Sequence, residues 1–142
     1  GLPRFFIPAE AEGHVEEMIS NVETMGVELP LFFIAGHMHI VGRDIKVSIR
    51  RDGADQCLLQ IPSWDFGWQL FYQYDVPIAE LPTVKQGDVL DIRCTYDNTK
   101  KNAHLAEGLE AEGMSAPVDV SMGEETLDEM CIAALGVLVP LK

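Results

Sequence analysis

Apolar and polar residues alternate strictly from Ile45 to Arg50, which is the period of a β-strand with one face in water. The Asp52–Gly53 pair follows, and Cys57–Pro62 then has the composition of a second strand. Because Asp-Gly between two strand-like runs favours a tight turn, this part of the chain is predicted to form a β-hairpin. It is a strong local signal for β-structure.

Further short strands are expected on both sides of this hairpin. They are marked by continuous or alternating apolar runs at Phe5–Pro8, Leu31–Ile40, Val89–Tyr96 and Ile132–Val139. The apolar residues of Val15–Met25 have helical spacing, but poor helix formers interrupt them, so a strand is the working prediction there. Short strands between turn signals, without a long helix, predict an all-β fold. We expect an antiparallel β-sandwich of the jelly-roll type, in a single domain over residues 1–142.

Two segments lack a clear strand pattern. The segment from Trp64 to Tyr74 contains six aromatic residues in eleven positions. Such residues can line a ligand site, but core packing is the preferred interpretation. The segment from Asp97 to Glu125 is polar, acidic and glycine-bearing, and it is expected to be a long loop.

The charge of the chain limits its partners. The formal net charge is −13 and the hydrophobic fraction is 47%. Nucleic acids and anionic membranes attract basic patches, so neither is expected as a partner. No apolar run approaches the length of a membrane span. The chain opens Gly1-Leu2-Pro3-Arg4 without a signal peptide, as expected for a mature or trimmed terminus.

Two of the four histidines lie within an expected apolar strand. Successive side chains on a strand point to opposite faces, so His37 and His39 should share one face while Met38 points away. Two adjacent imidazoles on a stiff element can begin a metal site, although a solvated polar face has the same pattern. His14 and His104 are interpreted as solvated side chains, with His104 as a spare ligand candidate.

Two kinds of metal site begin with a His-x-His sequence such as His37–His39. A cupin needs a third histidine after a later glycine turn, but Gly87-Asp88 is followed by Val89-Leu90, which argues against a cupin. The second kind uses Met130, because a thioether is a good ligand for Cu(I) and a poor one for harder ions. The competing role for Met130 is ordinary core packing.

The chain has three cysteines, Cys57, Cys94 and Cys131, which leave at least one free thiol or one intermolecular bond. The sequence alone does not choose the pair. A bond between Cys94 and Cys131 would cross adjacent strands and hold the strand of Met130 near the histidine strand.

Common catalytic motifs are absent from the sequence. It has no Gly-x-Ser-x-Gly elbow, no glycine-rich phosphate loop and no Cys-x-x-Cys, which argues against serine hydrolases, nucleotide enzymes and zinc ribbons. Four other motifs occur in a fixed order: His37–His39 before Gly42, then Gly87–Leu90, Cys94–Asn98 and Asp128–Cys131. Together they resemble the C-terminal domain of the copper type II, ascorbate-dependent monooxygenases. Peptidylglycine α-hydroxylating monooxygenase and dopamine β-monooxygenase belong to that family.

The resemblance implies a jelly-roll domain with one mononuclear copper bound by His37, His39 and Met130. It also implies a Cys94–Cys131 disulfide and an unpaired third cysteine. In this family the copper activates dioxygen for hydroxylation of a substrate C–H bond, and ascorbate is the external reductant. A disulfide and an oxidation-prone Cu(I) site would suit a secreted or periplasmic protein.

The sequence departs from the family in two ways. The family enzymes have a second copper, held by histidines in an N-terminal domain, and that domain is not in this sequence. We therefore expect a fragment that works with an N-terminal copper domain and is inactive alone; the alternative is a non-catalytic copper-binding or copper-carrying module. The peptide-hydroxylating member binds a substrate carboxylate at positions occupied here by Ala35, Ile132 and Ala134. These cannot bind a carboxylate, which argues against peptidylglycine and leaves the small-molecule or peptide substrate open.

Overall fold

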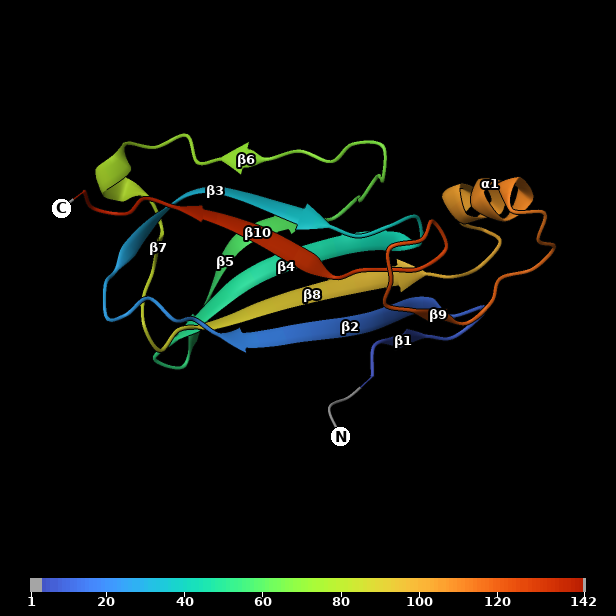
Figure 1. Ribbon diagram of the computed structural model, residues 1–142, viewed down its shortest axis with the longest axis horizontal. Helices are drawn as coiled ribbons and strands as arrows, with labels where there is room; N and C mark the ends of the chain where they lie inside the picture. Colours follow the sequence, from blue (N-terminus) through green and yellow to red (C-terminus); the bar gives the residue numbers. More distant parts are fainter. Residues whose placement is uncertain (1–3, 142) are drawn as a thin grey trace.

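The computed structural model describes residues 4–141, so the expected trimmed terminus at residues 1–3 lies outside it (Figure 1). One sheet has the strand order β2 (Glu12–Asn21), β8 (Val89–Asp97), β4 (Gly42–Arg51) and β5 (Ala54–Ile61). The second has the order β10 (Ile132–Val137), β3 (Leu29–His37) and β6 (Tyr72–Gln73), and β7 (Thr83–Val84) also pairs with β3. A small sheet pairs β1 (Phe6–Ile7) with β9 (Val120–Ser121). The helical elements are the 3₁₀ turn η1 (Ile78–Glu80) and the helix α1 (Ala103–Ala111).

The two larger sheets pack face to face. Figure 1 shows β3 and β10 lying across the layer formed by β4, β8 and β2. The apolar residues of β4 between Ile45 and Ile49 point into the space between the layers, and Ile34 of β3 faces them from the other sheet with 1% exposure. The pairings within the sheets are antiparallel. The all-β antiparallel sandwich is therefore confirmed, while the jelly-roll connection stays a prediction.

The hairpin prediction is confirmed in detail. β4 and β5 pair from Ile45–Ile61 to Arg51–Ala54 and are joined by a two-residue turn. Asp52 has φ of 51° and Gly53 has φ of 78°. Two consecutive positive φ values are what the favoured hairpin turn requires, and Asp followed by Gly tolerates them best.

The prediction of a long loop from Asp97 to Glu125 is wrong, because this segment contains α1. Asn102 caps the helix, and its side-chain oxygen accepts hydrogen bonds from the backbone N–H groups of His104 and Leu105. Leu105 and Leu109, four residues apart, are both buried and anchor the helix to the core. Over the described residues no helix has the length and apolarity needed to cross a membrane.

The core-packing interpretation of the aromatic segment is wrong for half of its members. Trp64 is 4% exposed, but Phe66, Trp68 and Phe71 are 38%, 67% and 72% exposed. Within this segment Tyr72 and Gln73 form the short strand β6, which pairs with β3. Most of the segment is therefore a surface loop that runs along the end of β3.

A disulfide joins Cys94 and Cys131, as the family resemblance implied. It does not cross adjacent strands of one sheet. Cys94 lies on β8 in the first sheet, and Cys131 precedes β10 in the second. The bond therefore ties the two layers of the sandwich together. Cys57, on β5, has a free and exposed thiol.

An ion pair holds the turn that leads into β8. Asp88 is 1% exposed and accepts hydrogen bonds from Nε and Nη2 of Arg51 at 2.8 and 2.7 Å, and from the backbone N–H of Lys85 at 2.9 Å. The hydrogen bonds from Arg51 lower the pKa of Asp88 below its ordinary value, against the opposing effect of burial. This pair connects the end of β4 to the turn before β8.

We expect Asp88→Asn to lower the free energy of unfolding by about 2 kcal/mol, because hydrogen bonds to a charged group are lost. The pKa of Asp88 is lowered on folding, so its stabilising effect is present above the ordinary aspartate pKa of about 3.9. The effect is lost as the pH falls through the lower folded value. Urea unfolding should therefore show a larger difference between parent and variant near pH 7 than near pH 2.

The matched control is Asp55→Asn, because Asp55 also pairs with an arginine, Arg50, but is 62% exposed. Exposed ion pairs contribute little, so this variant should unfold like the parent. Equal destabilisation by the two substitutions would contradict the role given to Asp88.

Candidate metal centre

The two histidines of the His-Met-His sequence meet at the end of β3, although not on one strand as predicted. β3 ends at His37, because β10 begins to pair only at Ile132, opposite His37. His39 lies beyond the strand end, and its carbonyl accepts the turn hydrogen bond from the N–H of Gly42 at 3.4 Å. The rings of His37 and His39 are nevertheless adjacent, with centroids 5.1 Å apart. Met38 is fully buried on the opposite side, as expected.

Both imidazoles are oriented through Nδ1. Nδ1 of His39 lies 2.8 Å from the carbonyl oxygen of Asp128, which can only accept a hydrogen bond, so Nδ1 carries the proton. Nδ1 of His37 lies 2.6 Å from Oε1 of Gln69. The amide nitrogen of Gln69 donates to the carbonyl of Phe66, which leaves its oxygen to accept from His37. Both Nε2 atoms therefore keep a lone pair, the arrangement typical of metal-binding histidines.

Glu129 connects the histidine segment to the segment that carries Met130. Its side chain is fully buried, and Oε2 accepts hydrogen bonds from the backbone N–H groups of His39 at 2.7 Å and Met130 at 2.9 Å. Oε1 accepts from the N–H of Val41 at 3.1 Å. Burial raises the pKa of Glu129 to about 7, and these backbone donors oppose the rise. A single carboxylate oxygen thus brings the main chains of His39 and Met130 together.

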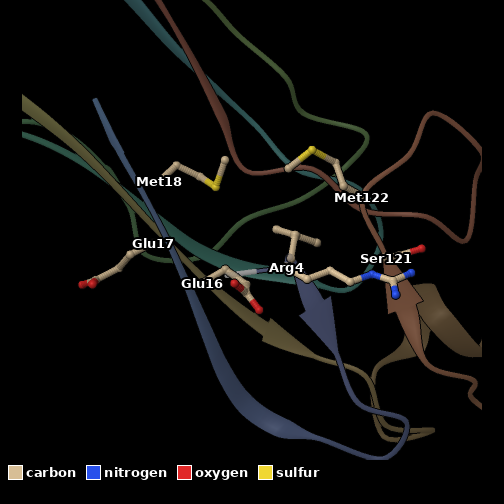
Figure 2. A pocket seen from close by; sticks show the side chains of 7 residues that line it. Arg4, Glu16, Glu17, Met18, Ser121 and Met122 are labelled. Atoms are coloured by element: carbon tan, nitrogen blue, oxygen red, sulfur yellow. The ribbon is translucent and has the colours of Figure 1, made fainter. Parts of the chain in front are cut away.

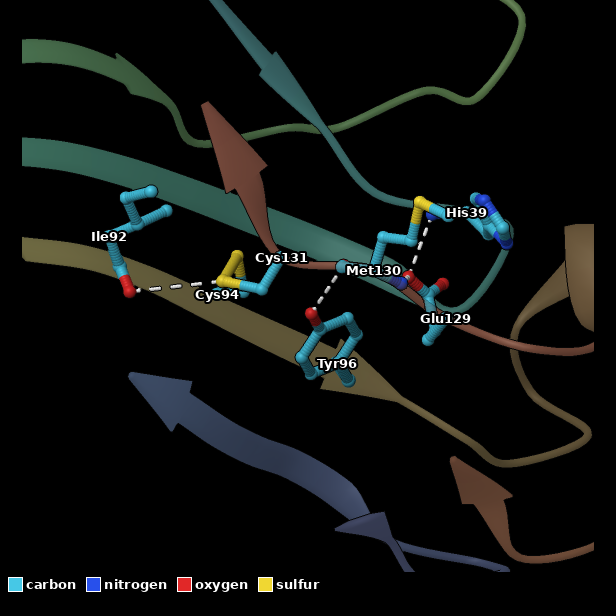
Figure 3. The surroundings of a disulfide bond; sticks show 7 residues. All are labelled: His39, Ile92, Cys94, Tyr96, Glu129, Met130 and Cys131. Atoms are coloured by element: carbon cyan, nitrogen blue, oxygen red, sulfur yellow. Dashed lines mark hydrogen bonds between the residues drawn. A yellow bond between two sulfur atoms is a disulfide. The ribbon is translucent and has the colours of Figure 1, made fainter. Parts of the chain in front are cut away.

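The main chain of Met130 is held by two further interactions. Tyr96 on β8 donates its hydroxyl proton to the carbonyl of Met130 at 2.7 Å, and the next residue, Cys131, is in the disulfide. Figure 3 shows the thioether of Met130 extending toward the part of the chain that carries His39. The three residues singled out in the sequence thus come from two segments that meet at Glu129.

The aromatic loop before β6 forms one side of this centre. Nε1 of Trp64 donates to the carbonyl of His39 at 3.1 Å, and the ring of Phe66 lies 5.9 Å from the ring of His39. Gln69 of the same loop is hydrogen-bonded to His37, so the loop contacts both histidines. Nothing in the sequence assigned these contacts to the loop, whose composition indicated core packing.

The other histidines lie on other elements. His14 is on β2, where its Nε2 is 2.8 Å from a carboxylate oxygen of Glu16. A hollow of about 390 Å³ lies along β2, and Figure 2 shows Met18 and Met122 at its rim. The residues that line this hollow do not include the candidate metal ligands. His104 is in the first turn of α1, where its backbone N–H donates to the cap residue Asn102.

The residue types at the centre restrict the metal that it can hold. Within residues 4–141, no three side chains of histidine, cysteine, aspartate or glutamate are grouped as in a metal site. A metal at His37 and His39 would need a different third donor, and the Met130 thioether is the candidate. Two imidazoles and a thioether fit a soft ion such as Cu(I).

Comparison with known proteins identifies the family of the chain. A family model described as copper type II ascorbate-dependent monooxygenase, C-terminal domain, matches residues 3–135. The chain belongs to this family. Among its curated relatives is DBH-like monooxygenase protein 1 from Gallus gallus, which is 30% identical over 140 residues. That match covers 95% of this chain but 19% of the relative, so the chain spans about a fifth of that protein's length.

The role of Glu129 can be tested by Glu129→Gln, which replaces one acceptor oxygen with an amide that donates. We expect the free energy of unfolding to fall by about 2 kcal/mol, because a buried backbone N–H would lose its acceptor. Hydrogen exchange followed by NMR should show faster exchange of the backbone amides of His39, Val41 and Met130.

The control is Glu125→Gln, an exposed position in the same loop. It should change neither the unfolding free energy nor the exchange of these amides. If both variants behave alike, Glu129 does not hold the two segments together.

Proposed function

We propose that this chain is the copper-binding domain of a monooxygenase that hydroxylates a substrate C–H bond, with His37, His39 and Met130 as the ligands of one copper ion. The observation that carries the proposal is the sharing of one Glu129 oxygen by the N–H groups of His39 and Met130. It supports a centre in which the thioether joins the two imidazoles.

The donor set is suited to copper. His37 and His39 would bind the ion through Nε2, since each Nδ1 is committed to a hydrogen bond. Bound copper would supply redox chemistry with dioxygen that no side chain can supply. The protein's own contribution is to fix the ligands: the carbonyl of Asp128 and the amide of Gln69 orient the rings, and Phe66 shields one side of His39.

The wider setting of this domain is part of the proposal. We infer that it acts with an N-terminal copper domain of the same polypeptide and uses ascorbate as the reductant. The coverage of only 19% of the curated relative's length leaves room for such a domain. The Cys94–Cys131 disulfide supports a secreted or periplasmic location, whereas the exposed thiol of Cys57 is not a feature that such a location predicts. The net charge of −13 supports a protein that binds neither nucleic acid nor anionic membrane.

The metal ligands are tested by Met130→Ile, which removes the sulfur and keeps an apolar side chain. We expect the parent domain to bind about one Cu(I) per chain and the variant to bind Cu(I) at least about tenfold more weakly, with a smaller change for zinc. Competition with a chromophoric Cu(I) chelator measures the Cu(I) affinity, and calorimetry measures the zinc affinity.

Met18→Ile is the matched control, because Met18 is also a half-buried methionine but lies on β2. It should bind Cu(I) like the parent. A Met130→Ile variant with unchanged Cu(I) affinity would show that Met130 is not a ligand.

Catalysis is tested on the full-length native protein rather than on this domain alone. Copper-loaded protein should consume dioxygen with ascorbate when a substrate is present, and Met130→Ile should abolish that consumption. The measurement is dioxygen uptake with an electrode. Absence of uptake across candidate substrates, with copper bound, would favour a copper-carrying module over an enzyme.

A further inference from the structure

The two sheets of the sandwich are offset by one strand. Cys131, which precedes β10, is bonded to Cys94 of β8, so the start of β10 lies over β8. On the other side, Tyr74 after β6 donates its hydroxyl proton to the carbonyl of Leu58 on β5 at 2.9 Å. The first sheet continues past β8 to β2, whereas the second sheet ends at β10. Within residues 4–141, β2 therefore has no strand of the second sheet over it (Figure 1).

The inner face of β2 is open to solvent as a result. Met18 pairs with the buried Ile92 of β8, so its side chain lies on the face that turns toward the second sheet. Ser20 comes two residues later and shares that face, but it is exposed. The hollow of about 390 Å³ begins at Met18, and Met122 faces Met18 across it (Figure 2). This open face lies where a fourth strand of the second sheet would cover it.

The free edge of β10 is suited to accept such a strand. In an antiparallel pair every second residue directs its N–H and C=O to the partner, and the residues between direct theirs away. Among the described strands β10 pairs with β3 alone, so its other edge is unpaired. The edge strand β2 is protected by three glutamates and a register shift at Gly13, and the edge strand β5 carries Asp55. β10 has no charged residue, and its register shift comes only at its end, so its edge is open to another strand.

A second copy of β10 does not fit at this edge. Two copies of one strand that pair antiparallel are related by a twofold axis perpendicular to their sheet. The first sheets of both copies would then lie on the same side of the joined sheet. Because β8 lies under the start of β10 in each copy, the β8 of one copy would collide with the β2 of the other. The geometry therefore favours a single extended segment over a folded copy of the chain.

The charges around the open face favour a basic segment. β2 contains three glutamates and no lysine or arginine, and the chain as a whole has a net charge of −13. Glu16 and Glu17 line the hollow, together with Arg4. Such a surface attracts a basic segment and repels an acidic one.

We propose that the free edge of β10 binds an extended, basic segment of a partner polypeptide as a fourth strand of the second sheet. The added strand would form main-chain hydrogen bonds with β10 and place an apolar side chain, at every second position, against Met18 and Met122. This interaction goes beyond the proposed function, and it needs neither copper nor the copper ligands.

The test uses the metal-free chain and a peptide of about eight residues, blocked at both ends, in which valine and lysine alternate. One control peptide has glutamate in place of lysine. The other keeps the side chains but has every backbone amide N-methylated, so that it cannot donate hydrogen bonds to β10. We expect the valine–lysine peptide to shift the ¹³C methyl signals of Met18 and Met122 to saturation in NMR spectra. Each control peptide should bind at least about tenfold more weakly.

Strand addition has a signature that apolar contact alone lacks. The backbone amides of β10 that point away from β3 exchange with solvent in the free chain. With the valine–lysine peptide bound, they should exchange at least about tenfold more slowly, because they become hydrogen-bonded. Hydrogen exchange followed by NMR measures this directly.

Two substitutions on β2 examine the open face. Ser20→Arg places a long charged side chain where the added strand would lie, and it should weaken binding of the valine–lysine peptide at least about tenfold. Asn21→Arg is the matched control, because Asn21 is also exposed and the change in charge is the same, but its side chain lies on the opposite face of β2. This variant should bind like the parent.

The inference would be overturned if the valine–lysine peptide did not bind, if either control peptide bound equally well, or if the amides of β10 gained no protection. Sedimentation velocity of the chain without peptide should give a monomer. A dimer that Ser20→Arg dissociates would mean that a second copy occupies the edge, and this too would overturn the inference. Cu(I) titration of the same sample tests the proposed function separately.

Discussion

The buried carboxylate of Glu129 is the interaction on which the candidate centre depends. A carboxylate with no exposed surface is costly unless its oxygens accept hydrogen bonds, and here backbone N–H groups satisfy them. The donors belong to the turn after β3 and to the residue before the disulfide, about 90 positions later. Because the contacts are to the backbone, the relative position of the His39 and Met130 main chains does not rely on the rotamers of either side chain. Such fixation of ligands before a metal arrives is what a site with few protein donors requires.

A second layer of contacts supports Glu129 from the neighbouring strand β8. Tyr96 holds the carbonyl of Met130, and Cys94, two residues earlier on the same strand and so on the same face, forms the disulfide with Cys131. The short segment around Met130 is thus tied to the first sheet, while the strand that follows it pairs with β3 in the second. The centre sits where the two layers are joined, which explains how a residue outside any strand is still held in place.

Structural features with a local signal could be predicted from the sequence. The hairpin at Asp52–Gly53 and the strands β4 and β8 follow from two-residue periodicity and turn chemistry. The helix α1 was missed although Asn102 is a strong cap and Leu105 and Leu109 have helical spacing, because the acidic composition of the whole segment outweighed a nine-residue pattern. When composition is averaged over a long segment, the pattern of a short helix within it is not detected.

Contacts between distant segments could not be predicted in the same way. The motif around Glu129 was visible in the sequence, but its role depends on hydrogen bonds to a turn that no periodicity reveals. Gln69 was hidden in a stretch whose aromatic content indicated a core, yet most of that stretch lies on the surface beside His37. His39 departs from the predicted strand because β3 loses its pairing partner after His37. In each case the position of the residue depends on its contacts with a segment that is distant in the sequence.

The outward placement of His37 follows from close packing on the other side of β3. Gly36 faces the core, where an added Cβ would lie 3.0 Å from Ile45, so the strand approaches β4 more closely there than a larger residue would allow. Because strand side chains alternate, a glycine fixed inward at position 36 forces Ala35 and His37 outward. A shift of one residue would turn the imidazole of His37 into the core and place Gly36 or Met38 at the metal centre. The tight contact between Gly36 and Ile45 therefore determines which residues of β3 face outward, and so places His37 at the candidate copper site.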